Sequence, residues 1–349
     1  MSVSLPDLQF DRPADLQATA PAEERGLTRD GVRLLVSDGD THTHTRFRDL
    51  ATVLEPGDLL VVNDSATLPA SLPATGPPGQ FLVNGSTDYG NGLWLVEPRW
   101  SESEPGPLSL SAGDRITVGG IHGHVVSEFP SIPRLVFVRF EGDVRAAMDV
   151  VGQPIRYGYV EDDYPLDTYQ TYFAATPGSA EMPSAARPFT HRVVESLRTR
   201  GIGIATITLH TGVASLEVNS EQQERTPLYP EPFRVPNATA RAVAATNARG
   251  QRVIAVGTTV VRALESAWDS DRERVMPTEG FTQLFVTPER GTRVVDGLLT
   301  GLHDPQTTHL AMLYAISSQQ AVMNGYREAI DEAYLWHEFG DTHLLLTEI

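Results

Sequence analysis

The feature that most constrains the fold is a change in the hydrophobic pattern between about residues 68 and 150. Short segments of alternating apolar and polar residues, such as GLWLVEP and RLVFVRF, are separated there by Gly, Pro, Asn and Ser. Short strands with frequent turn signals are typical of antiparallel barrels and sandwiches. The sequence therefore predicts a small antiparallel β-barrel domain at 68–150.

Beyond Pro154 the pattern changes to strand-like runs that alternate with helix-like segments. Such alternation is typical of a largely parallel sheet covered by helices. We therefore predict an α/β protein with a barrel-like main domain, 1–67 and 151–349, that the small barrel interrupts. The first 35 or so residues are polar and proline-marked, and we expect them to wrap the main domain. The expected helices are 190–200, 237–249, 258–268 and two within 306–335, and the expected strands include 59–62, 202–209, 252–257 and 283–286.

Composition narrows the possible partners. The chain has no cysteine, which excludes disulfides, thiolate metal sites and cysteine nucleophiles. Its net charge of −18 repels a polyanion at long range, so nucleic-acid binding would need a local basic patch. No signal peptide and no run of about 18 apolar residues occurs, so we expect a cytoplasmic protein without membrane contact, and a monomer. No compact set of metal ligands is visible, and we expect no metal.

Polar residues follow several of the predicted strands. Asp64 comes after the apolar run LLVVN, His210 ends TITL, and His303 follows GLLTGL. Ligands of parallel α/β sheets collect at the carboxyl ends of strands, and histidine titrates near neutrality. His210 is therefore a candidate acid or base, with a structural hydrogen bond to loop backbone as the alternative. For His303 the alternative is a role in the Asp-Pro turn that follows it.

The segment VIAVGTTVVRALES predicts a strand, a glycine and a helix that begins with two threonines. The free N–H groups and positive dipole end of such a helix suit a carboxylate or a phosphate. Gly257 would let the ligand approach, and Thr258 and Thr259 would line the site. Alternatively the threonines are caps, and Arg262 forms an i,i+3 ion pair with Glu265 on a solvated face.

The segment PSAARPFT places Phe189 and Thr190 just before a predicted helix. Thr190 is a candidate helix cap, and Phe189 is either a hydrophobic staple or a ring that stacks on a nucleobase. The chain lacks the motifs GxxxxGK[ST], GxGxxG and GxSxG. P-loop hydrolases, ordinary Rossmann dehydrogenases and α/β-hydrolases are therefore disfavoured.

Taken in order, the motifs resemble the S-adenosylmethionine:tRNA ribosyltransferase-isomerase family of queuosine biosynthesis. The resemblance covers nearly the whole chain and rests on ATAPAEER, FRDLATVLEPGDLLVVND, PSAARPFT, TITLHTGV, VIAVGTTVVRALESA, VVDGLLTGLHDP and YREAIDEAYLWHEFGD. It implies an α/β main domain with an inserted β-barrel. It also implies transfer of the ribosyl part of S-adenosylmethionine to the 7-aminomethyl-7-deazaguanine of tRNA, which gives epoxyqueuosine and releases adenine and methionine.

The resemblance also implies roles for individual residues. S-adenosylmethionine would be the ribosyl-donating co-substrate, without a metal. The candidate catalytic residues are His210, Glu231, Asp64 and His303, with proton transfer expected of His210 or Glu231. The candidates for binding the donor are Phe189, Thr190, Gly257, Thr258, Thr259 and Arg262.

The chain departs from the family pattern in several polar motifs. Where the family has NDTRVIPARL this chain has NDSATLPASL, so that Ala66 and Ser71 stand in place of arginines. Pro188 replaces a histidine, and Tyr229-Pro230-Glu231 replaces an HSE-type motif. Because the chain lacks these basic residues and has a net charge of −18, tRNA is one of several acceptors that the sequence allows. The alternatives are a relative that uses S-adenosylmethionine on a small-molecule acceptor, and a relative that binds S-adenosylmethionine without catalysis.

Overall fold

The computed structural model describes residues 8–101, 104, 108–130, 132–213 and 228–346. Its main domain is built around a nine-stranded sheet with the order β17-β13-β12-β3-β14-β18-β19-β1-β2. The strands are β1 (Arg33–Asp38), β2 (Thr41–Arg46), β3 (Leu59–Asn63), β12 (Gly203–Leu209), β13 (Glu231–Val235), β14 (Val253–Val256), β17 (Thr278–Thr282), β18 (Gly297–Gly301) and β19 (Thr342–Leu346).

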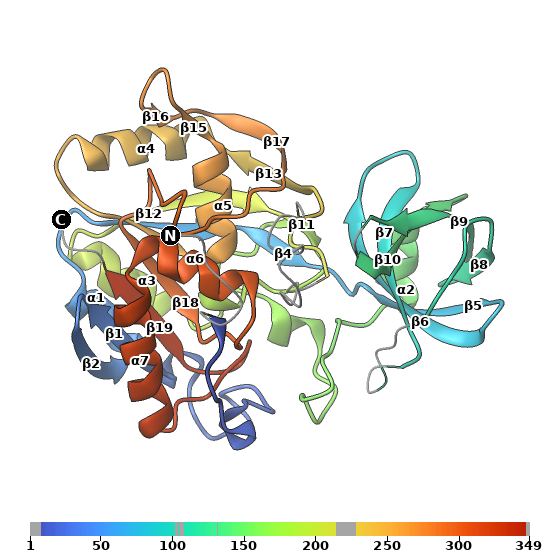
Figure 1. Cartoon of the computed structure of the whole chain (residues 1–349), viewed down its shortest axis with the longest axis horizontal. Helices are drawn as coiled ribbons and strands as arrows, with labels where there is room; N and C mark the ends of the chain where they lie inside the picture. Colours follow the sequence, from blue (N-terminus) through green and yellow to red (C-terminus); the bar gives the residue numbers. More distant parts are fainter. Residues whose placement is uncertain (1–7, 102–103, 105–107, 131, 214–227, 347–349) are drawn as a thin grey trace.

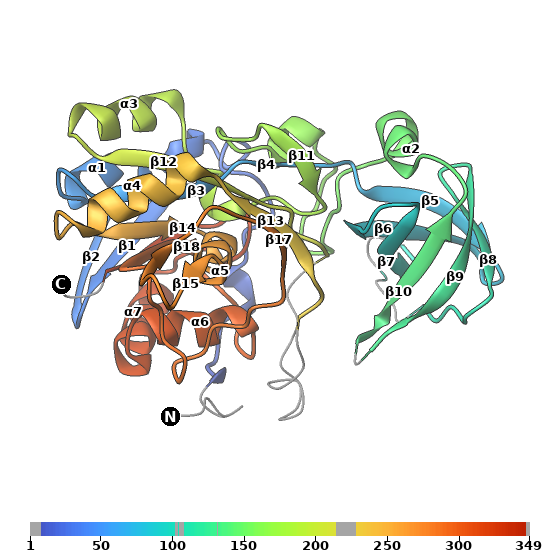
Figure 2. The same ribbon diagram turned by 90° about the horizontal axis from the view of Figure 1, so that it is seen from above.

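Helices cover this sheet on both faces (Figures 1 and 2). Strand β3 shows that the sheet lies between two hydrophobic cores. Leu59 and Val61 belong to one core, and Leu60 and Val62 belong to the other. A strand buried on both faces reads as a continuous apolar run, as in α/β folds. The helices are α1 (Leu50–Val53), α3 (His191–Thr199), α4 (Asn237–Asn247), α5 (Thr258–Ser266), α6 (Thr308–Ile316) and α7 (Gln319–Asp331).

The second unit is a closed six-stranded antiparallel barrel with the order β10-β7-β6-β5-β8-β9. It lies beside the part of the main domain that carries β4 (Ser65–Thr67) and β11 (Thr176–Ser179), which pair with each other (Figure 1). The predicted combination of an α/β main domain and a small β-barrel is confirmed. The barrel elements are β5 (Ser71–Gly76), β6 (Gly79–Asp88), β7 (Leu93–Arg99), β8 (Arg115–Val118), β9 (Ile121–Phe129), β10 (Ile132–Phe140) and the adjoining helix α2 (Val144–Val151).

Two details differ from the sequence prediction. The sheet is parallel through β12, β3, β14 and β18, but β18 pairs antiparallel with β19, and β13, β17 and β2 pair antiparallel at the flanks. The strand expected at 283–286 is wrong, since β17 ends at Thr282. There the Leu284 N–H donates to Thr282 Oγ1 (3.1 Å) and the Leu284 carbonyl accepts from Arg262 Nε (3.0 Å), so side chains take the bonds that a strand would use.

From Leu8 on, the N-terminal segment packs on the main domain as expected. The Ala18 N–H donates to the Trp336 carbonyl, and the Trp336 N–H donates to the Leu16 carbonyl. Within the described residues, no helix combines the length and the apolar character needed to cross a bilayer.

Candidate functional site

The polar residues predicted to follow strands meet at one edge of the sheet. Strands β12, β3, β14 and β18 run parallel, so their carboxyl ends share that edge. His210, Asp64, Gly257 and His303 follow these four strands. The PSAARPFT segment lies here as well, because a Cβ at Gly257 would contact Ala185 at 3.4 Å.

His210 is held by two buried serines. Its Nδ1 lies 2.7 Å from Ser65 Oγ, and Ser65 Oγ lies 2.6 Å from Ser179 Oγ. The ring packs directly on Gly178, where an added Cβ would approach it closer than 3.0 Å. Burial and the charge of Arg145 lower the pKa of His210, while Asp64 acts in the opposite direction. His210 is thus a neutral imidazole in a fixed orientation at pH 7.

Asn63 and Asp64 join the ends of β3 and β12. Asn63 is fully buried; its Oδ1 accepts from the Leu209 N–H (3.0 Å) and its Nδ2 donates to the Leu209 carbonyl (2.8 Å). This pair of bonds fixes the backbone that carries His210. Asp64 Oδ1 accepts from Thr208 Oγ1 (2.6 Å), and among the described residues Oδ2 has no hydrogen-bond partner. Asp64 therefore offers a free carboxylate oxygen.

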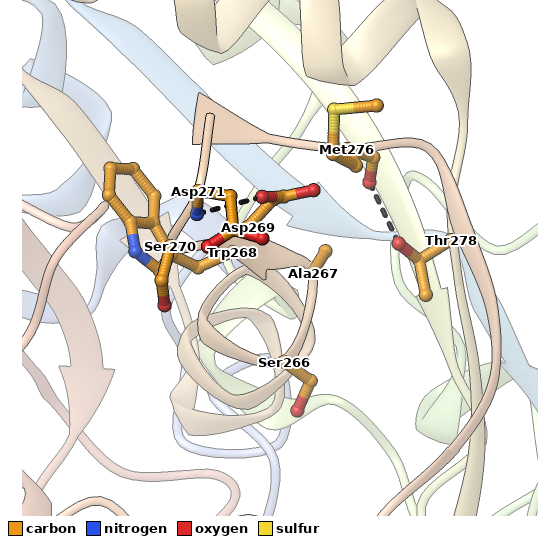
Figure 3. Close-up of a pocket in the computed structure, with 8 residues that line it drawn as sticks. All are labelled: Ser266, Ala267, Trp268, Asp269, Ser270, Asp271, Met276 and Thr278. Carbon is orange, nitrogen blue, oxygen red and sulfur yellow. Dashed lines mark hydrogen bonds between the residues drawn. The ribbon is translucent and has the colours of Figure 1, made fainter. Parts of the chain in front are cut away.

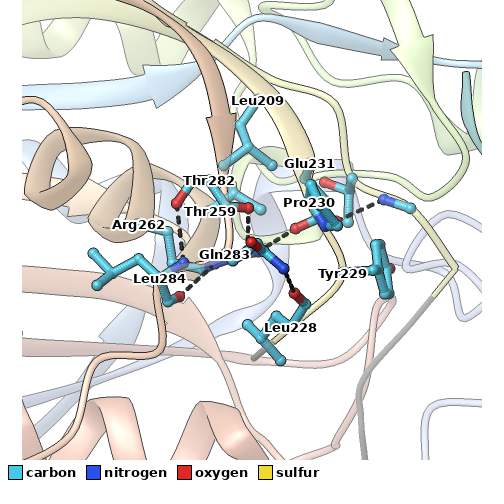
Figure 4. A network of polar contacts seen from close by, with 12 residues as sticks. Leu209, Leu228, Tyr229, Pro230, Glu231, Thr259, Arg262, Thr282, Gln283 and Leu284 are labelled. Carbon is cyan, nitrogen blue, oxygen red and sulfur yellow. Dashed lines mark hydrogen bonds and ion pairs between the residues drawn. The ribbon is translucent and has the colours of Figure 1, made fainter. Parts of the chain in front are cut away.

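Glu231 and Arg262 form a buried ion pair (Figure 4). Glu231 Oε1 accepts from the Gly212 N–H (2.7 Å), and Oε2 accepts from Arg262. Arg262 also donates through Nε to the Leu284 carbonyl. Since both oxygens of Glu231 are occupied, the pair acts as a clamp on the segment after His210. The alternative role for Arg262, an ion pair with Glu265, is wrong.

Glu265 has partners of its own. Its carboxylate accepts from Arg290 Nη1 (2.8 Å) and from the backbone N–H groups of Arg293 and Val294. Both Glu265 and Arg262 are buried, so neither lies on a solvated face. Each side chain is used to anchor a loop to α5.

His210 and Glu231 lie on opposite faces of the β12–β13 pair. The His210 N–H donates to the Pro232 carbonyl (3.0 Å), so His210 is directly opposite Pro232. Residues opposite each other across a strand pair share a face, whereas successive residues alternate. Glu231 therefore faces α5, and His210 faces the other way. The two do not form an acid–base couple.

The N-terminus of α5 is open. Gly257 has φ of 92°, a conformation that favours glycine, and no side chain of the described residues caps the helix. Thr259 Oγ1 accepts from Asn63 Nδ2 at 3.3 Å, and Thr258 is largely buried. The threonines are thus not caps. This helix end can hold an anionic group through its free N–H groups.

His303 sits in a separate histidine-rich cluster. Its Nε2 lies 2.8 Å from Thr300 Oγ1, and its ring centroid lies 4.7 Å from that of His309. Burial and neighbouring histidines hold the pKa of His303 well below its ordinary value. Strand β18 is three strands from β12, a distance of about 14 Å. His303 therefore lies at a different place along the sheet edge from His210.

Phe189 and Thr190 are used by the fold. Phe189 is 1% exposed and packs edge-to-face against Phe47 and Phe173, with centroid distances of 4.9 and 5.1 Å. Thr190 Oγ1 donates to Asp30 (2.7 Å) and accepts from the Val193 N–H at the start of α3. The structure therefore gives these two residues the packing and capping roles that were the alternatives to ligand binding.

Ser65, Gly178 and Ser179 were missed by the sequence reasoning. They belong to NDSAT and TPGSA, segments of small residues that carry no periodic or motif signal. Ser65 and Ser179 are both fully buried, and only the pairing of β4 with β11 brings them together. A buried serine beside a strand-end histidine is the signal that the tertiary structure adds.

A surface pocket lies elsewhere, at the C-terminal end of α5 (Figure 3). A nine-residue helix, about 13 Å long, separates it from Gly257. Of the two aspartates that line it, Asp269 already accepts bonds from the Asp271 and Arg272 N–H groups. Across the described part of the chain, no three His, Asp or Glu side chains are grouped so as to hold a metal ion.

The fold and the site define a two-domain α/β protein with an enzyme-like cluster at the carboxyl ends of its central strands. Residues 5–345 match the family described as queuosine biosynthesis protein, and the chain belongs to that family.

Relatives and a solved structure agree with this assignment. The chain is 37% identical over 336 residues to an S-adenosylmethionine:tRNA ribosyltransferase-isomerase of Thermus thermophilus, covering 93% of this chain and 95% of the relative. It is 37% identical to the protein of that name from Gloeobacter violaceus, covering 93% and 92%. The crystal structure of an S-adenosylmethionine tRNA ribosyltransferase from Thermotoga maritima is similar, with a TM-score of 0.54, 25% identity and coverage of 97% and 100%.

Proposed function

We propose that this chain is an S-adenosylmethionine:tRNA ribosyltransferase-isomerase. It moves the ribosyl moiety of S-adenosylmethionine onto the 7-aminomethyl-7-deazaguanine of tRNA, gives epoxyqueuosine, and releases adenine and methionine. The observation that carries the proposal is family membership over nearly the whole chain, together with relatives of that name at 37% identity. The enzyme works in the cytoplasm with its tRNA substrate, and we expect it to act as a monomer.

The reaction needs a base near the sulfonium centre. The sulfonium acidifies the adjacent C5′ hydrogens of the ribose, and collapse of the resulting carbanion opens the ribose and expels adenine. We assign the base to Asp64, since its Oδ2 has no hydrogen-bond partner among the described residues, whereas both carboxylate oxygens of Glu231 are occupied. His210, which lies beside Asp64, contacts the reacting part of the donor.

The donor's carboxylate is assigned to the N-terminus of α5. Gly257, Thr258 and Thr259 provide the open backbone and hydroxyl groups there. Arg262 is not assigned to the donor because it is held in its ion pair with Glu231. Through the bond between Glu231 and the Gly212 N–H, this pair fixes the segment after His210. Phe189 and Thr190 are left out of the donor site because their packing and hydrogen bonds are already used.

A small-molecule acceptor is the second candidate, favoured by the net charge of −18 and by the departures from the family pattern. Two of those departures carry less weight in the structure. Ala66 and Ser71, which stand in place of the family's arginines, are buried in β4 and β5. The loss of these arginines therefore does not mean the loss of an exposed charge. The tRNA acceptor therefore remains the first candidate.

Release of adenine tests the proposal. Purified protein is incubated with S-adenosylmethionine alone, with tRNA that carries 7-aminomethyl-7-deazaguanine, and with tRNA that lacks it, and adenine is measured by liquid chromatography. We expect release only with the modified tRNA. Release without tRNA would support the small-molecule acceptor, and S-adenosylmethionine binding without release would indicate an inactive relative. The same assay is run with Asp64→Asn, which removes the proposed base. The control is Asp163→Asn, the same substitution at a side chain that is 91% exposed.

A further inference from the structure

The hydrogen atoms of the two buried serines have a determined direction. Ser179 Oγ accepts from the Thr211 N–H at 3.0 Å, so its own hydrogen needs another acceptor. Ser179 is fully buried, and Ser65 Oγ, at 2.6 Å, is the acceptor that the described residues provide. Because buried hydroxyl groups are almost always hydrogen-bonded, Ser179 donates to Ser65.

The same reasoning fixes the next bond. Ser65 is also fully buried, and it accepts from Ser179. Its hydrogen therefore goes to His210 Nδ1, at 2.7 Å. A ring nitrogen that accepts a hydrogen bond carries a lone pair, and in neutral imidazole the proton is then on the other nitrogen. His210 thus carries its hydrogen on Nε2, which has no partner within the described residues.

The opposite arrangement leaves a buried donor without an acceptor. If Nδ1–H donated to Ser65, the hydrogen of either Ser65 or Ser179 would have no acceptor among the described residues. An unsatisfied buried donor is costly, and the same cost opposes a charged imidazolium. The charged groups near the ring are Arg145 of α2 and Asp64 after β3; burial and Arg145 lower the pKa of His210 and outweigh the effect of Asp64.

We propose that Ser179 and Ser65 are positioning residues that hold His210 as the neutral Nε2–H tautomer, so that it acts as a fixed hydrogen-bond donor and not as a proton carrier. The ligand atom opposite Nε2 is then a nitrogen or oxygen of S-adenosylmethionine that gains negative charge during the reaction. A preorganised hydrogen-bond donor aimed at such an atom stabilises the transition state without transferring its proton. Neutral imidazole loses a proton too reluctantly to be a general acid at pH 7. This inference rests on the proposed function for its ligand, whereas the tautomer follows from the fold alone.

The tautomer is measured directly by nitrogen NMR. In ¹⁵N-labelled protein at pH 7.5, long-range proton–nitrogen spectra distinguish a protonated ring nitrogen from one with a lone pair. The signals of His210, one of ten histidines, are identified by their absence in His210→Gln. We expect a lone pair on Nδ1 and a proton on Nε2. A proton on Nδ1, or a charged ring at this pH, overturns the proposal.

Ser65→Ala tests the source of the restraint. Without the Ser65 hydroxyl group, no hydrogen is donated to Nδ1, so that the second tautomer and the charged ring become accessible. We expect both forms to appear and the titration midpoint of His210 to rise. Thr239→Val, which removes a buried hydroxyl that donates to the Thr206 carbonyl of β12, is the control and should leave the His210 signals unchanged. Equal spectra for Ser65→Ala and the unmodified protein would contradict the role of Ser65.

Two substitutions of His210 separate hydrogen bonding from proton transfer. The amide nitrogen of glutamine lies near the Nε2 position, and that of asparagine lies near Nδ1. Loss of one preorganised donor costs on the order of 10²-fold in kcat, so we expect that loss for His210→Asn and a loss within about tenfold for His210→Gln. Equal losses in both variants would show that His210 carries a proton. The NMR result needs no turnover, so a protein with the expected tautomer and no adenine release would refute the proposed function alone.

Discussion

Substitution of Gly178 by alanine should impair turnover through His210. An added Cβ would approach the ring more closely than real Cβ atoms do, and the crowded atoms include Nδ1. Normal van der Waals separation is about 3.5–4.0 Å, so the ring must move by roughly 1 Å, away from Gly178. A misplacement of about 1 Å at a reacting group costs on the order of 10²-fold in rate. We therefore expect kcat for adenine release to fall by about that factor.

The assay compares Gly178→Ala with Gly280→Ala under saturating S-adenosylmethionine and modified tRNA. Gly280 lies on β17 and has open space at its Cβ position, so its variant should keep full activity. Overpacking also costs about 1–3 kcal/mol of stability, which urea unfolding measures, so the assay is run where both variants are folded. Turnover of Gly178→Ala within twofold of the control would refute the claim that the ring position of His210 matters.

Four further predictions concern the site and the buried charges. Asp64→Asn should lower kcat for adenine release by at least about 10²-fold, and unchanged turnover would remove Asp64 as the base. Arg262→Met should cost about 3–5 kcal/mol in urea unfolding because it leaves Glu231 buried without a counter-charge, and adding Glu231→Gln should recover much of that loss; strictly additive losses would contradict the pair. Burial lowers the pKa of His343 to about 3. As the pH drops from about 6.5 to 3, the unfolded protein therefore binds a proton at this position before the folded protein does, and the free energy of unfolding falls by about 1.4 kcal/mol per pH unit. His343→Gln should abolish this contribution, so that stability is lost less steeply with acid. Burial and Glu181 raise the pKa of Glu338 to about 8. The free energy of unfolding therefore falls by a similar amount per pH unit as the pH rises from about 4.5 to 8, and Glu338→Gln should become more stable relative to the unmodified protein between pH 6 and pH 8. A difference in stability between the two proteins that does not change with pH would contradict the raised pKa.

Much of the fold follows from local patterns. The apolar run at Leu59 to Val62 predicts a strand buried on both faces, and the structure places it at the centre of the sheet. The alternating segments at 68–150 predict the barrel because each strand there has one interior face. The strand expected at 283–286 fails because Thr282 and Arg262 bond the backbone there, and hydrophobic periodicity does not report such bonds.

The site was located by sequence reasoning, but its connections were not. Strand-end logic brought Asp64, His210 and Gly257 to one edge because parallel strands share their direction. The partners that decide their roles come from distant parts of the chain. Ser65 and Ser179 are 114 residues apart, and no local pattern joins them.

Glu231 shows the same limit. The family resemblance implied proton transfer for Glu231, whereas one of its carboxylate oxygens accepts from Arg262, 31 residues away, in a buried ion pair. A carboxylate at a predicted site is a base only if an oxygen is left free, and that depends on tertiary contacts.

The most direct test of the central claim is analysis of the tRNA product. Modified tRNA is incubated with S-adenosylmethionine and this protein, digested to nucleosides and examined by mass spectrometry, while adenine is measured in the same sample. We predict that 7-aminomethyl-7-deazaguanosine is converted to epoxyqueuosine, with one adenine released for each nucleoside converted. Unchanged nucleoside alongside released adenine, or no reaction of either substrate with folded protein, would contradict the account.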